Sequence, residues 1–130
     1  MDAREQLFAA YGDWREWTQR EGDAIRAQMW AEVERCQNAK AELQGRILEF
    51  TDAAQAASRR AGLDWSSVQS EISALVAQLI SMEHQNSDCL ALQRSEAEAQ
   101  HSDLCQAHRN LRRVHVSYGA AASSQWHSYS

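Results

Sequence analysis

The chain has 130 residues with a formal net charge of −5, no proline and only five glycines. Proline costs about 3 kcal/mol inside a helix, so its absence leaves long helices unopposed. The charges are spread along the chain without the basic face that phosphate backbones require, which argues against nucleic-acid binding. No apolar run reaches the roughly 20 residues needed to span a bilayer, so we expect no membrane insertion.

The start of the chain and its cysteines bear on the compartment. Residues 1–5 mix acidic and basic side chains and do not follow the pattern of a signal peptide. The three cysteines are an odd number without a tight pairing motif, which is typical of reduced thiols. We therefore expect a cytoplasmic protein.

The first predicted helix covers residues from about 2 to 26. Asp2 can cap it, with Glu5 three residues later in the capping-box position. Gly22 is expected to end or bend this helix, with Asp23 starting the next one. The pattern leaves open whether the chain between residues 22 and 30 is bent or broken. One helical stripe contains Leu7, Tyr11, Trp14 and either Trp17 or Thr18.

A second helix is predicted from about residue 30 to residue 60. Its stripe contains Lys40, whose stem can cover the apolar seam while its ammonium group reaches water. Arginines near residue 60 favour a helix C-terminus, and Gly62 can take the left-handed conformation that follows one. The stripe steps by three and four residues through Ile25, Met29, Val33, Cys36, Lys40, Leu43, Ile47 and Phe50.

A third, very long helix is predicted from about residue 64, with Asp64 as its cap, to residue 118. Asn86 lies on its heptad seam, where a buried amide fixes register and partner helix. The alternative is a contact between Asn86 and the backbone at a helix break. The seam follows a strict heptad through Val68, Ile72, Leu75, Leu79, Met82, Asn86 and Cys89.

The apolar stripe thins between residues 93 and 103 and then resumes. We expect the resumed part to accept an amphipathic partner helix. The alternative is that it packs against the first helix, as apolar stripes usually pack within a chain. The predicted partner-binding residues are Leu104, Ala107, Leu111, Val114 and Tyr118.

The predicted fold is all-α. We expect an elongated antiparallel helical hairpin, or a three-helix bundle with a very long third helix, as one bundle over residues 1–118. Residues 119–130 are small and polar and are expected to form a disordered tail.

The sequence contains no recognisable catalytic apparatus. It has no Gly-x-Ser-x-Gly elbow, no phosphate-binding glycine loop and no Cys-x-x-Cys pair, so we expect no enzymatic activity. The acidic residues are expected on solvent-facing helix surfaces. A metal- or haem-binding bundle is a third hypothesis, because His101, Cys105, His108 and His115 lie near one helix face. One straight helix rarely supplies four converging ligands, so we expect no metal site and no cofactor.

Three segments resemble parts of the FlgN-type flagellar export chaperones. Residues 30–43, with Lys40 followed by Leu43, resemble the family's second helix, and residues 82–90, around Asn86, resemble its third. Residues 111–119 are similar to the basic segment with which the family's sequences end, which finishes in a tyrosine. The FliT-type chaperones are the nearest rival, since they share a tryptophan-rich first helix followed by a short break.

The resemblance implies a cytoplasmic chaperone that holds the C-terminal region of hook–filament junction proteins before type III export. Its implied partners are flagellar hook-associated proteins and the export gate. The competing hypothesis is a structural or regulatory coiled coil that forms a homodimer, with a second copy closing the thin stripe and Asn86 setting the register.

Overall fold

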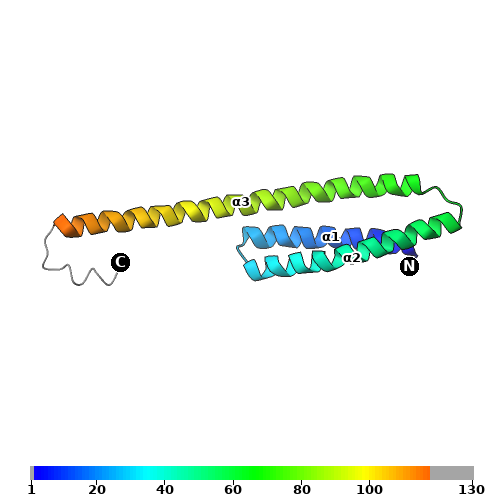
Figure 1. Ribbon diagram of the computed structural model, residues 1–130, viewed down its shortest axis with the longest axis horizontal. Coiled ribbons are helices and arrows are strands. Elements are labelled where there is room, and N and C mark those ends of the chain that lie inside the picture. The colour runs from blue at the N-terminus through cyan, green and yellow to red at the C-terminus, as the bar shows by residue number, and fades with distance from the viewer. Residues whose placement is uncertain (1, 118–130) are drawn as a thin grey trace. The chain divides into compact units, whose positions relative to one another are not determined.

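A computed structural model describes residues 2–117 of the chain. It contains three helices, α1 (Ala3–Arg26), α2 (Trp30–Arg60) and α3 (Trp65–Ser117), and no strand within the described residues (Figure 1). The predicted all-α class with a long third helix is therefore confirmed. The tail expected over residues 119–130 lies outside the described residues. The chain divides into two units, the first ending at Leu90 and the second beginning at Ala91, and each is described by itself.

The N-termini of α1 and α3 are capped by aspartates, as predicted. The Asp2 carboxylate accepts a hydrogen bond from the Glu5 backbone N–H at 2.8 Å. The Asp64 carboxylate accepts one from the Ser66 backbone N–H at 3.0 Å and another from the Ser66 hydroxyl at 2.7 Å. These two bonds to Ser66 lower the pKa of Asp64, the side-chain bond contributing most. Both helices thus gain a partner for backbone N–H groups that would otherwise lack one.

The helices α1 and α2 end in the same hydrogen-bond pattern. After α2, the Leu63 N–H donates to the Ser58 carbonyl at 2.9 Å, and Gly62 has a φ of 68°. After α1, the Met29 N–H donates to the Ala24 carbonyl at 2.9 Å, and Gln28 has a φ of 58°. Both ends are Schellman motifs, with Gly62 and Gln28 in the left-handed position. The prediction for Gly62 is confirmed, whereas the first turn uses a glutamine that carries the steric cost of this conformation.

The prediction that Gly22 ends the first helix is wrong. The helix α1 continues through this glycine to Arg26, and the two helices are separated at residues 27–29, within the interval expected for a break. A Cβ atom at position 22 would lie 2.5 Å from the Asn86 side-chain oxygen. Gly22 is therefore needed for a close approach between α1 and α3 in the first unit, and not for a turn.

The first unit packs around α1. The backbones of α1 and α2 run close together, and Figure 1 shows the two helices side by side and antiparallel. Leu7 and Cys36 are fully buried in this unit, and Thr18 is buried rather than Trp17, which settles the alternative on the first stripe. Burial raises the pKa of the Cys36 thiol, with a further contribution from Glu32. The buried apolar residues are Leu7, Ala10, Ala24, Ile25, Val33, Cys36, Leu43, Ala54, Val68 and Leu79.

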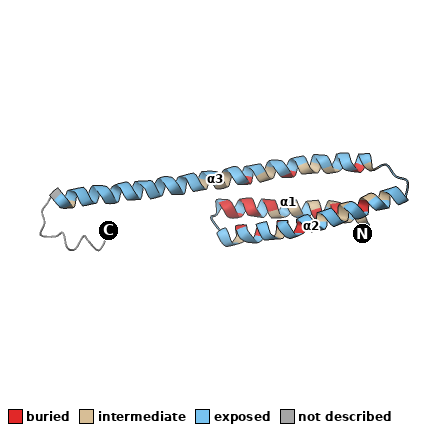
Figure 2. Ribbon diagram, viewed as in Figure 1, coloured by how far each residue is buried: buried red, intermediate tan, exposed pale blue. Residues whose placement is uncertain are grey.

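Burial along α3 changes at the boundary between the two units. Every buried residue of this helix, from Val68 to Asn86, precedes residue 91. Between residues 91 and 116 no side chain is buried, and only two are partly covered (Figure 2). The described part of the second unit is thus a single helix without a core of its own.

Candidate functional site

The predicted partner-binding residues lie in the second unit. Leu104, Leu111 and Val114 are 70%, 53% and 50% exposed, and Ala107 is also exposed. Their spacing of three and four residues places these four side chains on one face of α3. The structure therefore brings four of the five predicted residues together, whereas Tyr118 lies outside the described residues.

The segment that carries this stripe has no buried side chain between residues 91 and 116. Residues 91–117 are nonetheless helical throughout. Helices in water gain most of their stability from packing an apolar face, and isolated helices are marginal. A regular helix with exposed leucines is therefore a surface on which packing against another helix would stabilise both partners.

A buried ion-pair network occupies the interior of the first unit. The Lys40 ammonium lies 3.1 Å from the Glu21 carboxylate and 2.6 Å from the Glu83 carboxylate. The Lys40 and Glu21 side chains are only 8% and 5% exposed, and that of Glu83 is 37% exposed. One residue comes from each helix, so the network connects α1, α2 and α3 within this unit. A buried charge of this kind requires its partner, because an unpaired one is strongly destabilising.

Neutral donors complete the network. The Asn86 side-chain amide donates to the Thr18 carbonyl at 2.8 Å and to the Glu21 carboxylate at 3.1 Å. The Thr18 hydroxyl and the Trp14 indole N–H donate to the Glu83 carboxylate at 3.0 and 3.2 Å. Each buried polar side chain of this network thus has a hydrogen-bond partner, as a stable polar interior requires.

Three expectations are corrected by this network. The Lys40 ammonium was expected to reach water, but it donates hydrogen bonds to the Glu21 and Glu83 carboxylates inside the first unit. Glu21 is 4% exposed, so not all acidic residues lie on solvent-facing surfaces. Asn86 is buried on the seam as predicted, but it bonds α1 of its own chain and is therefore not available to set the register of a homodimer.

Sequence reasoning missed Glu21 and Glu83 as members of this network. Glu21 lies on the first stripe, three residues after Thr18 and four before Ile25, so its spacing was a signal of burial. The charged Lys40 on the second stripe was the matching signal, since opposite charges on two apolar seams can pair. Glu83 gave no such signal, because it lies beside the third seam rather than on it.

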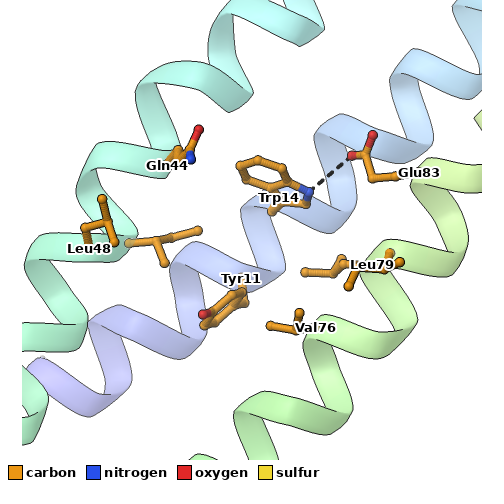
Figure 3. A pocket seen from close by; sticks show the side chains of 9 residues that line it. Tyr11, Trp14, Gln44, Leu48, Val76, Leu79 and Glu83 are labelled. Carbon is orange, nitrogen blue, oxygen red and sulfur yellow. Dashed lines mark hydrogen bonds between the residues drawn. The ribbon is translucent and has the colours of Figure 1, made fainter. Parts of the chain in front are cut away.

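An open apolar groove of about 280 Å³ lies beside the network in the first unit. Tyr11 and Trp14 of α1 line it together with Leu48 of α2 and with Val76 and Leu79 of α3 (Figure 3). Burial raises the pKa of the Tyr11 phenol. Apart from the two aromatic residues, only Gln44 and Glu83 contribute polar side chains to the lining, so the groove suits apolar contact.

The histidines and cysteines of the second unit do not form a metal centre in the structure as described. Within residues 2–117 no three or more histidine, cysteine or acidic side chains converge on one point. The nearest approach places the Cys105 sulfur 3.7 Å from the His101 Nε2 atom. Among the same residues no helix is long and apolar enough to cross a membrane.

The fold of the described residues defines an all-α helical protein with a long third helix. Comparison with known proteins adds no closer definition: no protein-family model, curated protein or solved structure matches the chain.

Proposed function

We propose that this protein is a holding protein that binds an amphipathic helix of its partner along the stripe of α3 formed by Leu104, Ala107, Leu111 and Val114. The observation that carries the proposal is the exposure of Leu104 and Leu111 on a regular helix with no buried side chain between residues 91 and 116. A helix with such a face gains most from a second helix laid along it.

The resemblance to FlgN-type chaperones gives this proposal a specific form. The partner would be the C-terminal region of a flagellar hook-associated protein, held in the cytoplasm before its delivery to the export gate. A helical first unit and an exposed helix that follows it are compatible with such a role. The proposal includes no catalytic step and no cofactor.

Copurification with hook-associated proteins tests the proposal. A double substitution, Leu104→Asp and Leu111→Asp, places two charges in the apolar interface and should abolish a complex that the unaltered chain forms. The matched control is Leu92→Asp with Val116→Asp, because these side chains are 61% and 78% exposed and lie off the stripe. The control variant should bind like the unaltered protein.

Two results would contradict the proposal. One is the failure of every hook-associated protein of the source organism to form a complex with the unaltered chain. The other is equal loss of binding in the stripe variant and the control variant, which would mean that the stripe is not the contact surface.

A deletion in the partner tests the other side of the complex. Deleting the C-terminal region of the bound partner should release the complex.

A further inference from the structure

The stripe of the second unit has the two rows of a coiled coil. Ala97, Leu104 and Leu111 follow each other at intervals of seven residues, and the second row, Gln100, Ala107 and Val114, follows three residues behind. Two such rows are the a and d positions of a heptad repeat. Each row contains one alanine and two larger side chains, so the stripe is neither uniformly bulky nor uniformly flat.

The same segment is electrically divided. Residues 91–103 contain three carboxylates and one arginine, a net charge of −2, whereas residues 104–117 contain three arginines and no carboxylate, a net charge of +3. All of these side chains are exposed. The segment is therefore acidic in its first half and basic in its second half.

We propose that a second copy of this chain binds the stripe in the antiparallel direction, with the two-fold axis passing between Cys105 and Gln106. Antiparallel coiled coils pack each a residue against a d residue of the other helix. This register sets Leu104 opposite Ala107 of the second copy and Ala97 opposite its Val114. These two layers each pair a larger side chain with a smaller one, the remaining layer sets Gln100 opposite Leu111, and the two-fold axis repeats every layer.

The charges favour antiparallel pairing of the two copies over parallel pairing. In this antiparallel register Glu98 lies within one residue of the level of Arg112 of the second copy and on the same side of the coiled coil, and Glu96 lies within two residues of the level of its Arg113. The two-fold axis produces both pairs twice. Parallel pairing at equal register would instead bring the acidic halves together and the basic halves together, which is unfavourable.

The dimer should be weak and sensitive to salt. The paired segment is little more than three heptads long, and its apolar rows include two alanines and a glutamine. Interfaces of this small size belong to the transient class. Exposed charges separated by about a Debye length are screened at high ionic strength, so added salt should dissociate the copies.

Self-pairing goes beyond the proposed function and does not depend on it. A second copy and a partner helix would occupy the same stripe, so the dimer would cover the apolar face until a partner displaces the second copy. The test uses the full chain alone, without any partner. Its failure would therefore leave the holding role untouched, and failure of the copurification experiment would leave the dimer untouched.

Sedimentation equilibrium measures the association directly. It should be run up to about 1 mM protein, the weak end of specific association, with a reducing agent because Cys105 is exposed. The unaltered chain should be in a monomer–dimer equilibrium. Glu96→Arg with Glu98→Arg gives both halves of the segment a net positive charge and should lower the association constant roughly tenfold or more. Adding Arg112→Glu and Arg113→Glu exchanges the two patches and should restore the dimer.

A matched control changes the same number of charges elsewhere. Glu34→Arg with Glu49→Arg alters exposed residues of α2 and should leave the association constant unchanged. A monomer at every concentration would overturn the proposal, as would a dimer that is indifferent to Glu96→Arg with Glu98→Arg. Preferential pairing of the unaltered chain with the exchanged variant would also overturn it, because only parallel helices bring their opposite charges together.

Discussion

The two parts of α3 differ in what surrounds them. Residues 65–90 share their unit with α1 and α2, and Val68, Leu79 and Asn86 are buried there. Residues 91–116 continue the same helix, and an apolar stripe resumes there after it thins between residues 93 and 103, but no side chain in this part is buried. The spacing of apolar side chains alone therefore does not tell which part of a helix is stabilised by packing. We infer that the first unit provides the stability of the fold and that the second unit provides the proposed binding surface.

The largest expected loss of stability comes from Lys40→Met. This change leaves the Glu21 carboxylate buried without its cation, which costs about 3–5 kcal/mol in the free energy of unfolding. Chemical denaturation of the full chain measures the loss. Adding Glu21→Gln removes the stranded charge and should recover most of it, since a glutamine oxygen can still accept from Asn86.

Arg46→Met is the matched control for Lys40→Met. Arg46 lies on the same helix, is 61% exposed and forms only a 3.7 Å ion pair with Glu42. Its removal should change the free energy of unfolding by less than about 0.5 kcal/mol. Equal effects of the two methionine substitutions would mean that the buried network does not stabilise the first unit.

Gly22→Ala should destabilise the first unit although alanine normally favours helices. The added Cβ atom would meet the Asn86 oxygen at 2.5 Å, and displacing this bonded amide should cost about 1–3 kcal/mol. Gly12→Ala is the control, because nothing lies within 4 Å of the new atom, and it should gain up to about 1 kcal/mol. Thermal unfolding of the two variants should therefore shift in opposite directions. A stabilised Gly22→Ala variant would contradict the close approach of α1 and α3.

Gln28→Gly should stabilise the turn between α1 and α2. Gln28 has a φ of 58°, which costs a residue with a Cβ atom about 1 kcal/mol and costs glycine nothing comparable. The control is Gln19→Gly, the same change at an exposed position inside α1, which should lose about 1 kcal/mol. A loss of stability in both variants would show that Gln28 is not in the left-handed conformation.

The smallest expected effect concerns the cap of α3. The hydrogen bonds from Ser66 hold the pKa of Asp64 below 3.8, so the charged form favours the folded state. The stabilisation is fully present above the unfolded-state pKa and is lost as the pH falls through the folded-state pKa. Denaturation of the unaltered chain and of Asp64→Asn across acid pH measures it. The stability difference between them should shrink as the pH falls, and a constant difference would contradict the cap.

Much of the fold was predictable because local signals decided it. Asp2 and Asp64 mark helix starts, Gly62 marks a helix end, and the absence of proline permits a third helix of 53 residues. The interval of the first turn was predicted, but its left-handed residue, Gln28, was not, because no local signal marks it. Gly22 was misread for the opposite reason, since the side chain that requires it, Asn86, belongs to a distant part of the chain.

The sequence predicted which side chains of the candidate site lie on one face of the helix, but it did not predict whether that face is exposed. Spacing placed Leu104, Ala107 and Leu111 together, and this follows from helix geometry alone. Whether another part of the chain covers that face is a matter of tertiary structure, which spacing does not report. The Lys40 network escaped prediction for the same reason, because the partner carboxylates come from two other helices.

Residue-resolved hydrogen exchange along α3, measured at low and high protein concentration, tests the division of this helix most directly. Amides near the buried residues of 65–90 should be protected up to the free energy of global unfolding, at both concentrations. Amides of 91–117 should exchange far faster at low concentration and gain protection as the copies associate. Equal protection of both parts, independent of concentration, would contradict the account.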